Sequence, residues 1–334
     1  MLSYRHSFHA GNFADVLKHC VCTHIFEHLL KKNKPFDYID THSGAGLFDL
    51  TGADANKLQE FTKGIHRIQS SKLPELRSYL NAVKAFNQAS TTKNIKFYPG
   101  SPALAAYFLR SNDKAHLHEL HPKDAKLLSI NINDLKGTVG QKSQIRVEVS
   151  DGLKNLQALV PPLSRRAFVL IDPSYEVKTE YDDVFFAVEK AYKKFPTGTY
   201  AIWYPVVERS RIDRLERKLG NSAIKNIQRF ELGIAPDSDA QGMTSAGLFV
   251  INAPWTLFDS MSQLLPKLAP LLANKELANK DLANAATTKE ELAGQALAGE
   301  DLQGGRPNKA LDHENLNTKN SATAYYKCDV IKAE

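Results

Sequence analysis

The chain has 334 residues, of which 43% are hydrophobic and 24% charged, so it can bury a large core in one or two globular domains. Lysine and arginine number 43 against 37 acidic residues, and the formal net charge of +6 permits a polyanionic partner such as a nucleic acid. No apolar run reaches the roughly 18 residues of a membrane span, the first residues lack the apolar core of a signal peptide, and the three cysteines lack zinc-site spacing. We therefore expect a cytoplasmic protein with reduced cysteines and no membrane association.

Apolar spacing predicts that helices and strands alternate along most of the chain. Residues 15–30 have helical spacing, and the run 36–40 predicts a first strand that ends in the glycine-containing turn 41–46. Residues 54–90 are polar with helical apolar spacing, which predicts an inserted helical hairpin. Further strands are predicted at 115–120, 145–149, 167–171, 200–204, 229–234 and 248–251. Strands that alternate with helices predict a doubly wound α/β fold.

Residues 273–318 differ in composition from the rest of the chain. Leu272, Leu277 and Leu282 recur every five residues, so they rotate around a helix instead of lining one face of it. We expect a flexible, low-complexity insertion there. Residues 321–334 regain strand-like apolar content, and we expect them to return to a body formed by residues 1–270.

The tetrapeptide Asp172-Pro173-Ser174-Tyr175 follows the buried strand 167–171, and it suits the recognition of a flat base with an exocyclic amine. The adenine amine is a poor nucleophile because its lone pair is delocalised into the ring. The Asp172 carboxylate and the Pro173 carbonyl can each accept one N–H, which favours a more nucleophilic nitrogen. The Tyr175 ring offers a stacking surface worth roughly 1–3 kcal/mol per base. Alone, the tetrapeptide is also compatible with an ordinary strand-to-turn junction.

Acidic residues and glycines recur where the predicted strands end. The set is Asp40, Gly44, Gly46, Glu119, Asp151, Gly152 and Asp172. Ligands of doubly wound folds bind beyond the carboxyl ends of the strands, so these residues would share one site. Glu119 can bind both hydroxyls of a ribose, and Asp151 can accept an adenine amine. Each acid alone would be a solvated strand end or a helix cap, but together they predict S-adenosylmethionine binding.

Other cofactors fit the pattern less well. The third glycine of a dinucleotide fingerprint would fall at Asp49, and no Gly-Lys-Ser/Thr phosphate loop occurs. The N-terminal histidines lack an i,i+4 pair with a nearby acid, so no metal site is predicted. The segment 4–12 predicts either a capped helix start, with Asn12 or Asp15 as N-cap, or a lid over cofactor and RNA on which Tyr4 stacks.

Several motifs resemble those of one family of RNA-modifying enzymes. They are residues 1–19, Asp40–Gly46, Tyr98–Pro102, Glu119–Pro122, Ser164–Arg166, Thr197–Ala201, Trp203–Val207, Pro236–Asp239 and Gly242–Thr244. Together they resemble the RlmJ family of 23S ribosomal RNA adenine-N6 methyltransferases over roughly residues 1–270. The chain departs from the family at Ser174, where the family usually has proline, and at 273–318, which the family lacks.

The resemblance implies roles for individual residues. The S-adenosylmethionine site would be lined by His19, His42, Ser101, Glu119, Asp151, Gly152 and Asp172. Asp172 would be the catalytic acceptor, Pro173 and Tyr175 would hold the adenine, and Tyr4 and Lys18 would contact the RNA. The wider RNA-binding face is expected to bear Arg5, Arg165 and Arg166, with Arg209 and Arg211. The family's target is the adenine conventionally numbered 2030 in 23S rRNA.

We therefore expect a class I S-adenosylmethionine-dependent methyltransferase fold, which is Rossmann-like, with a seven-stranded mixed sheet and a small inserted helical subdomain. The expected reaction is direct methyl transfer to a flipped-out adenine of 23S rRNA, free or in an early precursor. It would be carried out by a monomer, without a metal, and would leave S-adenosylhomocysteine. Two alternatives stay open. A DNA adenine-N6 methyltransferase would normally need a larger recognition domain than residues 54–90, and a non-catalytic RNA-binding protein could keep the same fold.

Overall fold

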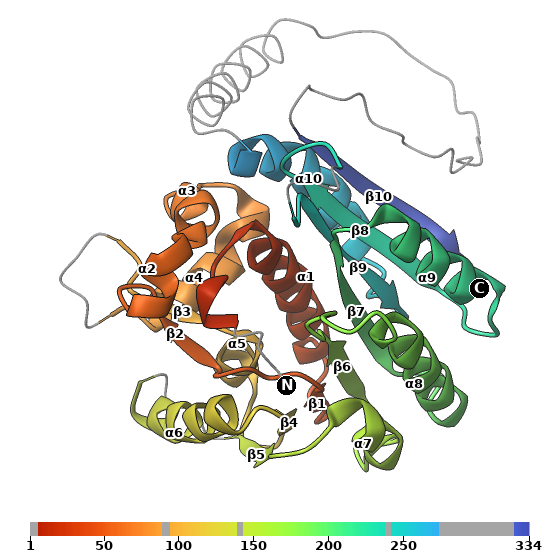
Figure 1. Cartoon of the computed structure of the whole chain (residues 1–334). Helices are drawn as coiled ribbons and strands as arrows, with labels where there is room; N and C mark the ends of the chain where they lie inside the picture. The colour runs from red at the N-terminus through yellow and green to blue at the C-terminus, as the bar shows by residue number, and fades with distance from the viewer. Residues whose placement is uncertain (1–5, 89–93, 139–142, 238–241, 274–323, 334) are drawn as a thin grey trace, which may run out of the picture.

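The computed structural model describes residues 6–88, 94–138, 143–237, 242–273 and 324–333. Within these residues, eight strands form one mixed sheet in the order β10-β8-β9-β7-β6-β1-β4-β5, and β2 and β3 form a separate pair (Figure 1). The strands are β1 (Asp37–Asp40), β2 (Leu47–Asp49), β3 (Phe97–Pro99), β4 (Lys114–His118), β5 (Gln144–Glu148), β6 (Ala167–Ile171), β7 (Thr199–Val206), β8 (Ile227–Gly233), β9 (Ser245–Ile251) and β10 (Tyr325–Lys332).

Five neighbouring strands of the large sheet, β5, β4, β1, β6 and β7, run parallel. The register aligns Tyr38 of β1 with Ala115 of β4 on one side and with Phe168 of β6 on the other. β9 is antiparallel to both β7 and β8, and β10 is antiparallel to β8. The carboxyl ends of the five parallel strands therefore meet at one edge, which is called the carboxyl edge below.

The sheet has one strand more than the seven predicted. The additional strand is β10, in which Tyr325 lies opposite Gly233 of β8. A side chain at position 233 would collide with the Tyr325 ring, since an added Cβ would lie 2.3 Å from it. The glycine therefore allows the C-terminal segment to pair closely with the sheet. Of the expected insertion at 273–318, only Ala273 falls within the described residues.

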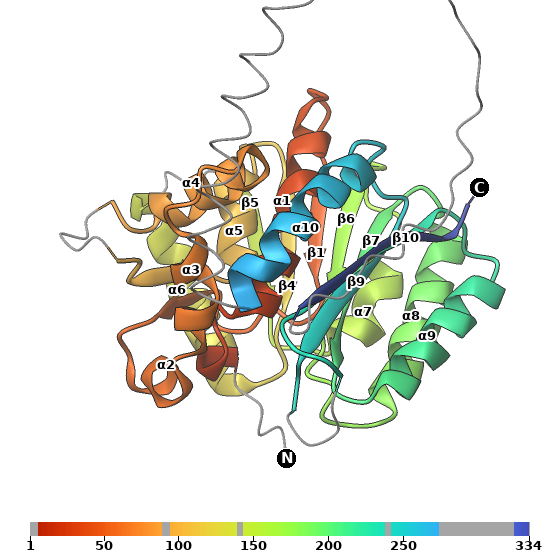
Figure 2. The same ribbon diagram turned by 90° about the horizontal axis from the view of Figure 1, so that it is seen from above.

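Helices cover both faces of the sheet, as the view from above shows for α10 on one side and α8 and α9 on the other (Figure 2). One core lies beneath α1, α5, α6 and α10, and a second core lies beneath α7, α8 and α9. The helices are α1 (Phe13–Leu30), α2 (Ala53–Leu58), α3 (Ile65–Ile68), α4 (Arg77–Ala85), α5 (Ser101–Phe108), α6 (Pro122–Thr138), α7 (Gly152–Leu159), α8 (Glu180–Lys194), α9 (Arg209–Asn221) and α10 (Leu257–Ala273), with short 3₁₀ turns η1 (His6–Phe8), η2 (Glu60–Lys63) and η3 (Pro74–Leu76).

Helix α1 is buried on most of its circumference because it packs against β9 and against α4, α5 and α10. It begins two residues before the predicted range 15–30, and of the two N-cap candidates it uses Asn12, whose side chain accepts the Asp15 N–H at 2.9 Å. Its buried face includes the charged pair Asp15 and Lys18, which points toward the carboxyl edge of the sheet.

The segment expected to be a helical hairpin contains a series of short helices instead. Helices α2, α3 and α4 are separated by the turns η2 and η3, and breaks fall at Gly64 and Pro74. A Cβ on Gly64 would lie 2.0 Å from the Gly11 carbonyl oxygen, and the Ile65 N–H donates to that same oxygen at 2.8 Å. Close packing on the segment before α1 thus interrupts the helix that the apolar spacing alone would allow.

None of the helices in the described ranges has the length and apolarity needed to cross a membrane. The three cysteines are buried free thiols.

Candidate active site

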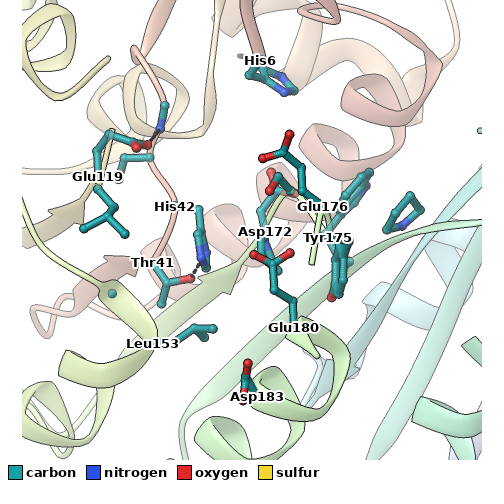
Figure 3. Close-up of a pocket in the computed structure, with 18 of the residues that line it drawn as sticks. His6, Thr41, His42, Glu119, Leu153, Asp172, Tyr175, Glu176, Glu180 and Asp183 are labelled. Carbon is teal, nitrogen blue, oxygen red and sulfur yellow. Dashed lines mark hydrogen bonds between the residues drawn. The ribbon is translucent and has the colours of Figure 1, made fainter. Parts of the chain in front are cut away.

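A pocket of about 1050 Å³ opens at the carboxyl edge of the sheet. Ten residues that the sequence assigns to the site line it, namely Lys18, His42, Gly44, Ser101, Glu119, Asp151, Gly152, Asp172, Pro173 and Tyr175. Figure 3 shows His42 and Glu119 on one side of the pocket, Tyr175 and Glu180 on the other, and Asp172 between them. The volume is at the upper end of the usual range for ligand pockets, so a cofactor and part of a second substrate can be accommodated together.

Asp172 stands directly after the fully buried strand β6 and faces a buried cation. The Lys18 ammonium lies 2.6 Å from Asp172 Oδ2 and 2.9 Å from Asp15 Oδ1. On the far side of Asp15, His6 Nε2 lies 2.9 and 3.0 Å from the two carboxylate oxygens. A chain of alternating groups, His6–Asp15–Lys18–Asp172, therefore connects the segment before α1 to the end of β6.

In this series of four side chains, each charged group stabilises the ionised form of its neighbour. Burial raises the pKa of Asp172, and the Lys18 ammonium limits the rise. For Lys18, burial alone would lower the pKa, but Asp15 and Asp172 together outweigh it and raise the pKa above its usual value. Burial would raise the pKa of Asp15, yet His6 and Lys18 hold it well below its usual value. Lys18 therefore stays protonated and holds Asp172 in place.

Glu119 follows β4 and is held by backbone donors. Its two carboxylate oxygens accept the N–H groups of Gly44 and His121, each at 2.7 Å. Gly44 has a φ of +58°, a conformation that glycine adopts without strain, and this lets the turn after β1 approach Glu119. Burial raises the pKa of Glu119. Each oxygen keeps one lone pair, so the carboxylate can still accept hydroxyl groups from a ligand.

The turn after β1 carries His42. The Thr41 hydroxyl lies 2.8 Å from His42 Nδ1, and burial lowers the pKa of His42 to about 4, so the imidazole is neutral near pH 7. Asp40, which precedes it, does not line the pocket. Its carboxylate is fully buried, accepts the Tyr38 hydroxyl at 2.7 Å and bonds to Ser101, and burial raises its pKa to about 6. Asp40 therefore stabilises the turn, and the expectation that it faces a ligand is wrong.

Asp151 and Gly152 begin α7. Asp151 caps the helix by accepting the Lys154 N–H at 3.1 Å, and it also forms an ion pair with the Lys154 ammonium at 2.8 Å. A Cβ on Gly152 would lie 2.4 Å from the Thr41 carbonyl oxygen. The glycine thus brings the start of α7 against the turn after β1, so that both lie on the same side of the pocket.

Tyr175 combines an unusual backbone with a packed ring. Its φ is +54°, which is strained for a tyrosine. The hydroxyl donates to the Trp203 carbonyl oxygen at 2.7 Å, and the ring centroid lies 4.3 Å from that of Tyr181. The ring is thereby fixed in the wall of the pocket, with Tyr181 against it. Pro173, two residues earlier, is buried and also lines the pocket.

Other sequence-predicted residues do not take the positions that their expected roles require. His19 is fully buried in the core, where Nδ1 lies 2.7 Å from the Tyr98 hydroxyl and the two rings stack, and it is not among the lining residues. Lys18, expected to contact RNA, is 3% exposed. Its ammonium forms ion pairs with Asp15 and Asp172 inside the protein. Tyr4 and Arg5 lie outside the described residues.

The arginines expected on the RNA-binding face are dispersed. Arg166 lies before β6, at the opposite edge of the sheet, and donates to the Leu29 carbonyl oxygen at 2.7 Å. Arg209 is engaged with the buried Glu231 and with Asp237. Arg211 does line the pocket, where it pairs with Glu208 at 2.6 Å. The expectation of one compact face is therefore wrong, because consecutive loops of a parallel sheet leave at opposite edges.

Sequence reasoning missed several lining residues, among them His6, Asp15 and Trp203. His6 and Asp15 belong to the helix start, for which the sequence predicts a cap or a lid but no contact of these two side chains with Lys18 and Asp172. Trp203 lies near the end of β7, is 9% exposed, and leaves its indole nitrogen buried without a partner among the described residues. Its place near the carboxyl end of a strand is the signal that could have found it.

Comparisons with known proteins show which family the chain resembles. The family model described as "Ribosomal RNA large subunit methyltransferase D, RlmJ" matches residues 33–281. Two relatives, each called ribosomal RNA large subunit methyltransferase J, come from Escherichia coli K12 and Haemophilus influenzae Rd. The first is 48% identical over 80% of this chain and 92% of its own length, and the second 46% over 81% and 94%.

A solved structure is also similar, a protein from Legionella pneumophila with a TM-score of 0.71 and 35% identity. The match covers 79% of this chain and 94% of that one. The mixed sheet, with its parallel strands opening on the pocket, is a class I methyltransferase fold. The family match spans most of the chain and includes every predicted residue that lines the pocket except Lys18. The chain therefore belongs to the ribosomal RNA large subunit methyltransferase J family.

Proposed function

We propose that the protein is an S-adenosylmethionine-dependent methyltransferase that methylates N6 of one adenine in 23S rRNA. By resemblance, the target is the adenine conventionally numbered 2030. The observation that carries the proposal is the position of Asp172-Pro173 beyond β6, in a pocket whose opposite side is built from Glu119 and the turn after β1. The two relatives described above are named as methyltransferases of large-subunit rRNA.

The residues of the pocket fit the cofactor. Acids predominate along the lining, which suits a cationic methyl donor. Glu180 Oε2 and Trp203 Nε1 are buried without hydrogen-bond partners among the described residues, so the pocket offers an acceptor and a donor to a ligand. Glu119 would hold the ribose hydroxyls, and the start of α7 and His42 would form the wall beside the adenine ring. When bound, S-adenosylmethionine supplies an electrophilic methyl group.

The protein's own groups act on the adenine amine. Asp172 and the Pro173 carbonyl would each accept one N–H, which fixes the nitrogen and localises its lone pair. The nitrogen gains a methyl group and must release one proton. Asp172, whose pKa burial raises, is the acceptor within the pocket. Lys18 keeps the carboxylate oriented, and Tyr175 provides a fixed wall for the base, with stacking worth roughly 1–3 kcal/mol.

Unstacking the target base costs a few kcal/mol, least in loops and bulges. We therefore propose that a monomer acts in the cytoplasm on free 23S rRNA or an early precursor, before tertiary and protein contacts lock the RNA. Residues 1–270 would form the catalytic domain with its helical insertion.

The experiment is methyl incorporation from labelled donor into equal amounts of three substrates: deproteinised 23S rRNA, intact large subunits and duplex DNA. The RNAs come from cells that lack the enzyme. Fastest labelling of the deproteinised rRNA supports the proposal. Fastest labelling of intact subunits would contradict the substrate assignment, and labelling of DNA would favour a DNA methyltransferase. Binding of S-adenosylhomocysteine without any labelling would indicate a non-catalytic protein.

A further inference from the structure

Cations gather at the edge of the sheet opposite the pocket, in three loops that precede β1, β4 and β6. We call this set the amino-edge surface, and its members are Lys31, Lys32, Lys34, Arg110, Arg165 and Arg166. The three lysines and Arg165 are exposed, and the other two arginines are half-buried. None of the residues assigned to the active site belongs to it.

Two arginines hold the lysine-bearing loop in shape. Arg110 donates to the carbonyl oxygens of Lys32 at 3.0 Å and Lys34 at 2.9 Å. Arg166 donates to the same Lys34 oxygen and, at 2.7 Å, to the Leu29 oxygen at the end of α1. The free carbonyls that follow the helix are therefore already satisfied. The lysine side chains between them project from a fixed backbone, which lowers the entropy cost of binding a ligand.

The positive charge of this surface is largely unbalanced. Arg110 pairs with the buried Asp113 at 2.8 Å, but among the described residues Lys31, Lys32, Lys34 and Arg165 form no ion pair. Two neighbouring groups respond to the field. After the effect of burial, Lys31, Lys32 and Arg166 further lower the pKa of His28, and Arg110 likewise lowers that of Arg166. Like charges held together this way repel one another, and a polyanion would relieve the repulsion.

Stabilisation of the C-terminal end of helix α1 explains only some of the cations of the amino-edge surface. One lysine after a helix is stabilising because it faces the negative end of the helix dipole, and Lys31 fits that account. The later lysines lie beyond the end of the helix, where Arg166 already bonds to the Leu29 carbonyl oxygen and Arg110 to that of Lys32. Exposed lysines also occur for solubility, but solubility does not require a backbone fixed by two arginines.

An exposed aromatic ring borders the same edge. Trp255 follows β9, which is antiparallel to β7 and so ends at this edge, and its side chain is 77% exposed. The Lys31 ammonium lies 5.8 Å from the Trp255 ring centroid. Cations interleaved with an exposed aromatic are typical of surfaces that bind the phosphates and unpaired bases of RNA.

From these observations we propose that the amino-edge surface is a second RNA-binding site, which holds the phosphate backbone of the large substrate away from the methylated adenine. The inference rests on the proposed function and extends it. Helix α1 connects the two sites: Lys18 lies at the pocket and Lys31 at the far end, a separation of roughly 20 Å at 1.5 Å per residue. A long folded RNA has segments on either side of the methylated adenine that can reach the opposite edge of the sheet, and a short hairpin lacks those segments.

The test compares long and short RNA. A triple variant, Lys31→Glu, Lys32→Glu and Lys34→Glu, leaves both clamping arginines in place. Its matched control carries the same charge change at exposed lysines elsewhere, Lys63→Glu, Lys84→Glu and Lys126→Glu. Steady-state methylation is measured on deproteinised 23S rRNA and on a hairpin of about 20 nucleotides around the mapped adenine. The salt dependence of KM is recorded for each RNA.

The triple variant is expected to raise KM for 23S rRNA at least tenfold. The slope of log KM against log salt concentration should fall by about 3, one for each phosphate that a lysine no longer neutralises. Its kcat, its KM for the hairpin and its affinity for S-adenosylhomocysteine should stay within twofold of wild type. The control should change KM for the long RNA less than threefold. If the triple variant does not fold, Lys32→Ala and Lys34→Ala are measured singly, each with an expected loss of two- to fivefold on the long RNA only.

An equal increase in KM for both RNAs, or in the variant and its control, would overturn the inference. The net charge of the protein would then explain the weaker RNA binding without a specific surface. An unchanged KM for 23S rRNA would overturn it as well. A wild-type protein that methylates neither RNA would instead contradict the proposed function.

Discussion

The Lys18 ammonium bridges Asp15 and Asp172, two carboxylates from helix α1 and from the end of β6. Such a buried cation balances two buried charges at once, and breaking one partner of a buried pair is usually strongly destabilising. In this pocket the consequence is also chemical, since Asp172 is the group that would accept the amine N–H. Lys18 thus acts on the reaction through Asp172.

Lys18→Met should lower methyl transfer at pH 7 by at least a hundredfold while S-adenosylhomocysteine affinity changes only a few fold. Without the ammonium, the two carboxylates repel each other, and the pKa of Asp172 rises further above its usual value. The carboxylate must be ionised to accept the amine, so the residual activity should rise toward higher pH and its acidic limb should shift upward from that of wild type.

The measurement is kcat against pH for both proteins, with Lys63→Met as a control at an exposed position. An acidic limb at the same pH in Lys18→Met and wild type would show that Lys18 does not set the ionisation of Asp172.

His19 should contribute to the pH dependence of stability. Burial lowers its pKa to about 3 in the folded protein, against an ordinary value of 6.5. Between these two pH values the unfolded chain binds a proton that the folded protein does not, so the free energy of unfolding falls as pH falls, by about 1.4 kcal/mol per pH unit for one proton. Removing this group with His19→Asn should make the slope shallower.

Urea unfolding at pH 6 and pH 5 measures this effect. The loss of stability between the two should be about 1 kcal/mol smaller in His19→Asn than in wild type. Identical losses would mean that His19 is not neutral in the folded core.

The part of the site that can be predicted from sequence lies where the strands end. Glu119, Asp151, Gly152 and Asp172 can be identified because each follows a recognisable strand, and parallel strands bring their carboxyl ends to one edge. His19 illustrates the limit of this reasoning. Helical periodicity places it near Lys18, but its ring turns to the core because Tyr98, 79 residues later, supplies a hydrogen bond. No local pattern predicts that partner.

Other differences have the same origin in long-range packing. The Lys18–Asp172 pair joins residues 154 positions apart. The break at Gly64 between the short helices follows from contacts with Gly11, and the eighth strand follows from pairing between Tyr325 and Gly233. Composition and periodicity report the local preference of each segment, whereas these features depend on which distant segment packs beside it.

Gly152→Ala should destabilise the protein by about 1–3 kcal/mol and weaken S-adenosylhomocysteine binding, because the added methyl group collides with the Thr41 backbone. Gly220→Ala is the matched control. A Cβ there meets nothing within 4 Å, and the position lies inside α9. The control should be stabilised by up to about 1 kcal/mol.

Both variants are compared by denaturant unfolding and by isothermal titration with S-adenosylhomocysteine. Gly152→Ala with the stability and affinity of wild type would show that the turn after β1 and the start of α7 need not touch.

Replacing residues 274–318 with a flexible linker of about 15 residues should leave methyl transfer within twofold of wild type. Their five-residue period offers no continuous apolar face for packing, and α10 and β10, which flank them, contact each other directly. Activity on 23S rRNA and thermal unfolding are the readouts. Loss of activity in a protein that unfolds at the wild-type temperature would assign a role to the segment.

The most direct test of the account is nucleoside mapping of 23S rRNA after reaction with wild type and with Asp172→Asn. The asparagine keeps the shape of the side chain but cannot take up the proton released by the amine. Wild type is predicted to form N6-methyladenosine at a single adenine, and Asp172→Asn to lose at least 90% of this activity, about 1.4 kcal/mol or more of transition-state stabilisation, while it still binds S-adenosylhomocysteine. A methyl group on another base or atom, or an Asp172→Asn variant with more than a tenth of the wild-type rate, would contradict the account.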